Sequence, residues 1–440
     1  MKIFKPRQLA VYGILLTSIT ASGVVMAEKV AQGSHVPSPA LVELIQNSLS
    51  DNPELQALKA ELKSARATLR ASNQAIFNPE LEFDYEDIDS TKNSDGSISD
   101  GATTTTLGIN QTIDWGDQRG SRTAVASASL QKNIASYRLA NQTFISELLS
   151  RQAEFQTRNE LSRLSNETLA IMQEFREISE NRYEAGDLTQ VELNLALLSH
   201  NQSLMQQANS TANASEARAN LSAFLGFLPA VSIQLPEQLP APEFNGKLDD
   251  LLQNLPIVQI QKAELNIAKN QVNLRKSEKA WNPTIGVRAG KEEDASLIGF
   301  NLSIPLNVRN TFSAEVDAAQ QQSIAIEQRT HLAYRNIRAR VTSTTKRYSN
   351  LLMAWNHWRI SGRSSVDQQL ILIKQLWKTG DISAADYILQ LKQALETRAT
   401  GVELRNQLWQ VSFEWMRLTD TLDNWLNISI TLPNQTTGNQ

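Results

Sequence analysis

Two stretches of the chain alternate residue by residue between apolar and polar side chains. In FNPELEFDYE (77–86), Leu81, Phe83 and Tyr85 occupy every second position, with acidic residues between them. WNPTIGVRAG (281–290) begins with the same aromatic-Asn-Pro sequence and alternates in the same way. A period of two residues predicts β-strands with one apolar and one polar face, and Asn-Pro predicts the point where a helix stops and a strand starts. Together with the stretches that follow them, these segments predict strands at about 79–88, 103–114, 283–290 and 297–305.

Two much longer stretches have the composition of helices. Residues 118–185 are rich in Ala, Leu, Glu, Gln, Arg and Ser, contain no Pro, and have a single Gly, Gly120, near their start. At 1.5 Å per residue, a helix of about 68 residues would be about 100 Å long, and residues 310–379 would form one of similar length. Helices of this length do not fit in a globular domain, so they predict a coiled coil or a helical tube. Strict Leu heptads are missing, which favours helices that pack on more than one neighbour over a solvated two-stranded coil.

The chain repeats its own plan. PELQALKAEL begins at Pro53 and PIVQIQKAEL begins at Pro256, and the two long runs break at RYEAGDLTQVE (182–192) and LWKTGDISAAD (376–386). Each half therefore reads helix, strand, strand, long helix, turn, helix, which indicates a structural duplication. We expect a first structural repeat at 28–227, a Pro-rich linker at 228–256, a second structural repeat at 257–427 and a C-terminal tail at 428–440.

The first residues have the pattern of a secretory signal. Lys2, Lys5 and Arg7 precede an apolar stretch, and VMA (25–27) fits a small-x-small cleavage site. We therefore expect a signal peptide at 1–27, with a membrane anchor as the alternative. Loss of its three basic residues would lower the net charge from −4 to −7, which argues against a nucleic-acid partner. The chain contains no cysteine, so disulfides, Cys-ligated zinc, a thiol nucleophile and a lipid anchor on an N-terminal Cys are excluded.

The strands are the part of the chain that could cross a membrane. No later stretch approaches the ~18 consecutive apolar residues that a membrane helix needs. A soluble antiparallel sheet would show the same alternation. Phe77, Trp115 and Trp281 stand at the helix–strand junctions, where an aromatic belt would meet a membrane interface, and they favour the membrane interpretation. Because small barrels need about eight strands, four strands predict an oligomer.

With these features the chain resembles the TolC-like outer-membrane efflux proteins over about residues 40–427. The resemblance rests on the duplicated plan, the Asn-Pro at the helix ends and the Gly-containing turns between long helices. TIDWGDQRGSRTAVASA (112–128) is similar to the CzcC-like branch linked to heavy-metal efflux, although Trp115 departs from the small residues usual there. The resemblance implies a mainly α protein with a membrane β-barrel part, in which a trimeric 12-stranded β-barrel stands on a long α-helical barrel.

The resemblance also implies a function and a set of partners. The chain would be an outer-membrane exit duct that passively conducts substrates, metal cations among the candidates, from periplasm to exterior. Its partners would be two further copies, a periplasmic adaptor, an inner-membrane pump of the RND type and outer-membrane lipid, with no cofactor. The exit duct of a type I protein-secretion system is the alternative within the family. A secreted coiled-coil structural or adhesion protein is the alternative of another class.

In the family, the turns between long helices form the periplasmic end of the tunnel and meet the adaptor. This implies docking turns at Gly186, Asp187, Gly380 and Asp381. Asp386 matches the position of a family aperture Asp, and Glu192 is its counterpart in the first half. The family's second aperture Asp would fall at Leu389, so that ring is not reproduced. Carboxylates near a helix start also simply complement the helix dipole, which is the alternative for both residues.

One strand face offers a further candidate site. Acidic rings favour cations in a pore, and the polar face of the first strand would line the barrel lumen with Glu80, Glu82, Asp84 and Glu86. A generally polar lumen is the alternative. The chain contains no GxxxxGK(S/T), HExxH or GxSxG motif, and its four histidines are far apart in the sequence, so we expect neither an enzyme nor a metal site.

Overall fold

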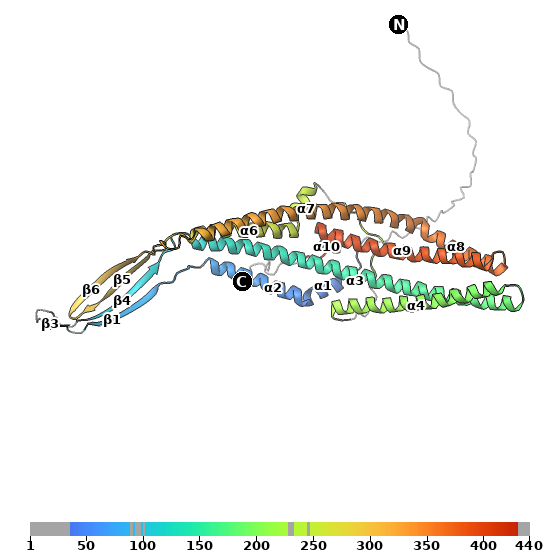
Figure 1. Cartoon of the computed structure of the whole chain (residues 1–440), viewed down its shortest axis with the longest axis horizontal. Helices are drawn as coiled ribbons and strands as arrows, with labels where there is room; N and C mark the ends of the chain where they lie inside the picture. Colours follow the sequence, from blue (N-terminus) through green and yellow to red (C-terminus); the bar gives the residue numbers. More distant parts are fainter. Residues whose placement is uncertain are drawn as a thin grey trace, which may run out of the picture.

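The computed structural model describes residues 36–88, 91–92, 98–99, 102–227, 233–243 and 247–429. The chain is an elongated rod, with a small sheet at one end and helices along the remaining length (Figure 1). It is mainly helical with a small sheet, which confirms the fold class expected from the sequence. The expected signal peptide at 1–27 lies outside the described residues, as do parts of the linker and almost all of the tail.

The first half begins with two short helices that share one type of start signal. Ser38 and Asn52 each accept a hydrogen bond from a backbone N–H of the first turn, and each is followed by Pro at the first helical position. The elements in order are α1 (Pro39–Asp51), α2 (Pro53–Ser72), β1 (Glu80–Ile88), β2 (Thr91–Lys92), β3 (Ile98–Ser99), β4 (Ala102–Thr112), α3 (Gln118–Glu184) and α4 (Gln190–Leu225).

The second half follows the same order, with one short helix before it and one after it. Its elements are α5 (Leu248–Asn254), α6 (Pro256–Ser277), β5 (Thr284–Glu292), β6 (Ala295–Ser303), α7 (Ser313–His357), the π-helical turn η1 (Trp358–Gly362), α8 (Arg363–Thr379), α9 (Ala384–Thr419) and α10 (Leu422–Leu426).

Four strands, two from each half, form one antiparallel sheet in the order β1-β4-β5-β6. Leu81 lies opposite Ile109, which lies opposite Val287, which in turn lies opposite Phe300. The register therefore places the apolar residues of all four strands on one face and their polar residues on the other. Within this sheet β1 and β6 are edge strands, each with one side unpaired.

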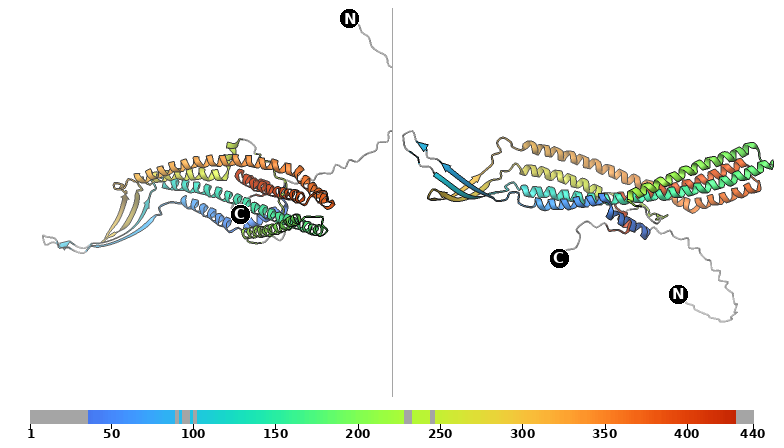
Figure 2. Two further views of the ribbon diagram at one scale, coloured as in Figure 1. Left: turned by 45° about the vertical axis from the view of Figure 1, so that its right-hand side comes forward. Right: turned by 90° about the horizontal axis from the view of Figure 1, so that it is seen from below.

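The long helices of the two halves lie side by side along the rod (Figures 1 and 2). α3 is central, because it packs against α2 and α6 near the sheet and against α4 and α9 farther away. α7 packs on α6 and α9, and α8 continues beside α9 to the end that is distant from the sheet. Near the sheet, the helices lie side by side in the order α2, α3, α6 and α7. At the distant end, the order is α4, α3, α9 and α8.

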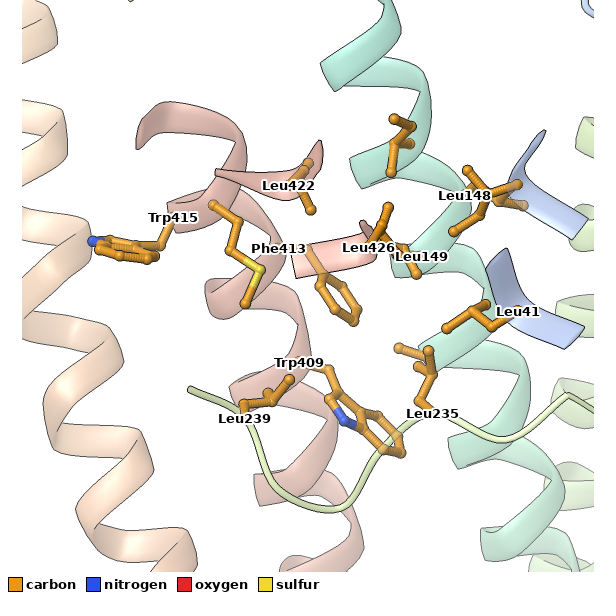
Figure 3. Close-up of a cluster of buried hydrophobic side chains, with 14 of the residues drawn as sticks. Leu41, Leu148, Leu149, Leu235, Leu239, Trp409, Phe413, Trp415, Leu422 and Leu426 are labelled. Carbon is orange, nitrogen blue, oxygen red and sulfur yellow. The ribbon is translucent and has the colours of Figure 1, made fainter. Parts of the chain in front are cut away.

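The main hydrophobic core lies where α1, α3, α9 and α10 meet (Figure 3). Trp409 and Phe413 of α9 are fully buried there, against Leu148 and Leu149 of α3. Each fully buried side chain of this size contributes about 1.5–3 kcal/mol. Three aromatic donors fix the linker to this core: Trp409 Nε1, Trp355 Nε1 and Tyr348 Oη donate to the backbone carbonyls of Pro236, Glu237 and Pro240 at 3.0, 3.0 and 2.5 Å.

The second long helix differs from the uninterrupted run expected at 310–379. α3 is continuous over 67 residues, whereas its counterpart is divided into α7, η1 and α8. At this point the indole of Trp358 is held between two glycines. An added Cβ would lie 2.4 Å from the ring at Gly362, one turn along, and 2.3 Å from it at Gly401 of α9. The π turn coincides with the place where this large ring is inserted between two closely packed helices.

We expect Gly401→Ala to destabilise the helical part of the protein. The added methyl group would clash with the Trp358 ring, and such overpacking costs about 1–3 kcal/mol, which outweighs the gain of up to about 1 kcal/mol from helix propensity. Thermal unfolding followed by circular dichroism measures the effect, with the exposed neighbour Thr400→Ala as the control. A stability unchanged by Gly401→Ala would show that the indole can move away at no cost.

Candidate functional site: the sheet and the helical tip

The apolar face of the sheet is uncovered. Phe83 is 66 % exposed and Phe300 is 82 % exposed, and no described helix packs against this face. Such a large continuous apolar surface on a water-soluble protein would be an aggregation or interaction site. The other members of this exposed face are Leu81, Tyr85, Leu107, Ile109, Ile285, Val287, Ile298 and Leu302.

The opposite face of the sheet is polar, and its acidic residues form a column along β1. The amide of Asn110 donates to Glu82 at 2.6 Å, and the hydroxyl of Thr106 donates to Asp84 at 3.2 Å. The register places Arg288 on this face, two strands away from Glu82, where its side chain lies across Gly299. The structure thus places the predicted residues Glu80, Glu82, Asp84 and Glu86 together on β1. Arg288 lies on the same face of the sheet, on strand β5.

The three junction aromatics lie between the helices and the sheet. Trp115 is 74 % exposed and Trp281 is 54 % exposed, while Phe77 is half-buried. Large indoles so exposed are costly in water but suited to the interface between water and hydrocarbon.

At the other end of the rod, both tip turns have the same backbone geometry. Gly186 and Gly380 have φ values of 83° and 81°, in the left-handed region that glycine adopts without strain. Asp187 N–H donates to Arg182 O at 2.8 Å, and Asp381 N–H donates to Leu376 O at 2.9 Å. These are Schellman ends of α3 and α8, and they explain why glycine occurs at this position in both halves.

The two aperture candidates lie at the helix starts that follow these turns. Glu192 accepts from the N–H and the hydroxyl of Thr189 at 3.0 and 2.7 Å, and the hydrogen bond from this N–H lowers the pKa of Glu192. Asp386 accepts from the hydroxyl of Ser383 at 2.7 Å. Both carboxylates therefore serve their own helix caps. Leu389, one turn beyond Asp386, is 67 % exposed.

Ion pairs and hydrogen bonds join the two tips, and the sequence did not predict them. The carboxylate of Glu174 in α3 forms ion pairs with Lys374 and Lys378 of α8 at 2.6 and 3.0 Å. The hydrogen bonds that these lysines donate lower the pKa of Glu174. Arg182 donates to the carbonyls of Trp377 and Lys378 at 3.0 and 3.3 Å. A cation at these carbonyls complements the C-terminal end of α8. In the sequence, only the four-residue spacing of Lys374 and Lys378 indicates a shared partner. That partner, Glu174, lies 200 residues before Lys374.

A ring cluster lies beneath these polar contacts. Trp377 packs against Phe175 and Tyr387 with ring centroids 5.1 and 5.3 Å apart, and the Arg182 guanidinium lies 4.5 Å from a Trp377 ring centroid. Burial, together with the nearby charge of Glu174, raises the pKa of Tyr387 to about 12. Since exposed ion pairs are worth about 0.2–1 kcal/mol each, the buried rings hold the tips together and the ion pairs align them.

Two further properties concern metals and membranes. Across the described ranges, no three His, Asp or Glu side chains come together in a group that could bind a metal ion. None of the described helices is both long and apolar enough to cross a membrane.

Comparisons with known proteins agree with this geometry. Residues 44–227 match the family model of the outer membrane efflux proteins. No curated protein sequence matches the chain. Among solved structures, the chain is similar to the Campylobacter jejuni CmeC outer membrane channel (TM-score 0.70, 14 % identity, covering 96 % of this chain and 98 % of that one). It is also similar to the open state of the Neisseria gonorrhoeae MtrE outer membrane channel (TM-score 0.66, 18 % identity, covering 92 % of this chain and 95 % of that one). A third similar structure is the outer membrane protein VceC of Vibrio cholerae (TM-score 0.69, 16 % identity, covering 86 % of this chain and 96 % of that one).

The family match covers the first half, and the shared fold extends over both halves. On these two findings, the first half of the chain matches the outer membrane efflux protein model, and the whole chain shares the fold of these channels.

Proposed function

We propose that this protein is an outer-membrane channel that passively conducts substrates from the periplasm to the cell exterior, as the exit duct of a tripartite efflux system. The observation that carries the proposal is the sheet at one end of the rod, with one face apolar and uncovered and the other polar. A bilayer satisfies the first face and a water-filled lumen satisfies the second. The long helices, 67 residues in the case of α3, then extend the duct into the periplasm.

The duct needs three copies of the chain. Strands β1 and β6 are both open edges, and an unpaired strand edge in hydrocarbon leaves costly unsatisfied backbone groups. When β6 of one copy pairs with β1 of the next, three copies close a 12-stranded barrel without any edge. The repeats at 28–227 and 257–427 then alternate around the tube, and α2 and α4 of one copy face α7 and α8 of its neighbour.

The duct has no reaction of its own, and it depends on partners for energy. An inner-membrane pump of the RND type drives transport, and a periplasmic adaptor joins the pump to the tip turns at Gly186, Asp187, Gly380 and Asp381. The exposed turns support this role, because an added Cβ at either glycine would meet no atom within 4 Å. Asp386 and Glu192 lie just beyond the turns and line the aperture there.

The acidic column on β1 gives the lumen its selectivity. Three copies would present twelve carboxylates, at Glu80, Glu82, Asp84 and Glu86, against three copies of Arg288. Such a field favours cations, which makes metal cations candidate substrates of this duct.

The assignment of the strand faces predicts different effects of Arg at three positions. Phe83→Arg and Phe300→Arg would place a charge in lipid at a cost of about 2–4 kcal/mol per site near the midplane, whereas Asn301→Arg would face the lumen and be tolerated. Membrane fractionation and heat-modifiable migration of the trimer on SDS gels measure insertion. Equal loss of insertion in all three variants would contradict the assignment.

The docking role of the tip predicts that Tyr183→Pro abolishes efflux while membrane insertion and trimer formation persist. Proline there removes a helical hydrogen bond in the last turn of α3 and costs about 3 kcal/mol locally. Tyr183→Ala is the control, because it keeps the backbone intact. Trp377 is a poorer position for the same test, since its ring is buried in the tip cluster. Loss of insertion in Tyr183→Pro would mean that the tip is a folding element instead.

The acidic column predicts a cation preference that salt weakens, because the Debye length falls from about 10 Å at 0.1 M to about 3 Å at 1 M. Replacing Glu80, Glu82, Asp84 and Glu86 by Gln or Asn should remove most of this preference and keep the barrel. Reversal potentials in planar bilayers measure it, in a background of Glu174→Gln and Arg182→Ala that loosens the contacts between the tips. If the preference persists unchanged, the carboxylates of Asp386 and Glu192 are the next to test.

A further inference from the structure

A groove of about 510 Å³ lies at the junction between the helices and the sheet, beside the apolar face. Its walls are the two indoles of Trp115 and Trp281, together with Pro283 and aliphatic side chains that include Ile285 and Leu302. Lys279 is the charged member of the lining. The groove therefore combines an apolar interior with a single ammonium group.

The backbone around the groove is tightly held. Ile113 N–H donates to Pro283 O at 2.9 Å, which ties the end of β4 to the residue before β5. Gly116 lets the next turn lie directly against α6, because an added Cβ there would be 2.4 Å from Ser277 O. The amide of Asn307 donates to Lys279 O at 3.1 Å. Since the walls are fixed in this way, the groove exists before any ligand arrives.

The local charge favours an anion. Lys279 is exposed and forms no ion pair with any described residue. The nearby carboxylates are already engaged: Glu278 pairs with Arg275 at 2.7 Å, and both oxygens of Asp114 accept backbone N–H groups at the start of α3 at 2.8 Å. A ligand with one phosphate and an apolar chain would thus complement both parts of the groove.

The groove is continuous with the face that the proposed function places in lipid. Ile285 and Leu302 lie opposite each other in the sheet register and belong to both surfaces. The indoles mark the depth of the membrane interface, where lipid phosphates lie. An acyl chain could therefore run along the sheet into the groove while its phosphate stays level with Lys279.

The duplication limits the number of such grooves. Phe77 of the first half corresponds to Trp281, and Ala75 stands where the second half has Lys279. The first junction therefore offers neither the larger indole nor the ammonium group at the matching positions. One site per chain, and three per trimer, follow from this asymmetry.

We propose that this groove binds one glycerophospholipid with a net negative headgroup, from the leaflet nearer the helices. Its acyl chain lies between Trp115 and Trp281, and its phosphate pairs with Lys279. The inference rests on the proposed function only in placing the sheet in a bilayer.

Native mass spectrometry of the purified trimer tests the proposal, with phosphatidylglycerol or phosphatidylethanolamine added in detergent. Up to three phosphatidylglycerol molecules should be retained per trimer, in preference to phosphatidylethanolamine. Lys279→Ala should weaken the retention of phosphatidylglycerol about fivefold and that of phosphatidylethanolamine less, because the ammonium group of the latter already offsets its phosphate, while Lys279→Arg should restore the preference. Trp281→Ala should lower the occupancy of both lipids. Lys269→Ala, at an exposed position on α6 ten residues before Lys279, is the matched control.

Three outcomes would overturn the proposal. Lipid counts well above three with no headgroup preference would indicate an ordinary lipid belt. Unchanged retention in Lys279→Ala and Trp281→Ala would place the bound lipid elsewhere. Protection of Trp281 from oxidative labelling in a delipidated trimer would mean that the neighbouring copy fills the groove. Membrane insertion of the same variants is measured in parallel, so that a failure of the channel proposal itself is seen separately.

Discussion

The sheet has an apolar face that no described helix covers and two edges that no other described strand pairs. A bilayer can satisfy the face, and further copies of the chain can satisfy the edges. The other features follow from these two needs. In the channel that we propose, the helices continue away from the membrane, and the aromatic-Asn-Pro junctions change the chain from helix to strand at the membrane interface. The groove beside Trp281 is one consequence, because the change of direction leaves apolar walls next to a helix end.

Asymmetry between the two repeats gives the duplicated plan its individual features. α3 runs without interruption, whereas its counterpart contains a π turn where Trp358 lies against Gly401. The acidic column belongs to β1 alone, and the corresponding strand β5 carries Arg288. The linker is held to the core by three aromatic donors from α7 and α9, so that the joint between the repeats is part of the packed structure. The duplicated plan supplies the framework, including the polar face and the tip turns, and differences between the repeats give the acidic column and the π turn.

At the distant end, the structure holds one hairpin of each repeat against the other. The ring cluster of Phe175, Trp377 and Tyr387 provides the buried area, and Arg182 caps the carbonyl end of the opposite helix. Exposed ion pairs of the kind formed by Glu174 are individually weak and depend on ionic strength. Packing therefore holds the two hairpins of the tip together, and the polar contacts set how the hairpins are aligned.

The sequence by itself determined the element order, the duplication and the two faces of each strand, because these depend on local periodicity and on Pro and Gly at the element ends. It also located the turns at Gly186 and Gly380, since Gly-Asp between long helices predicts a left-handed cap. It did not reveal the contacts of Glu174 with Lys374 and Lys378, or the Trp358–Gly401 approach that interrupts the second long helix. Those depend on which helices lie side by side, and residues that are distant in sequence meet only after the two repeats pack. The capping roles of Asp386 and Glu192 are local instead, because each carboxylate accepts from a hydroxyl three residues earlier, and the Ser/Thr-x-x-Asp/Glu spacing is itself a sequence signal for such a cap. The approach of the helices belongs to the tertiary structure alone.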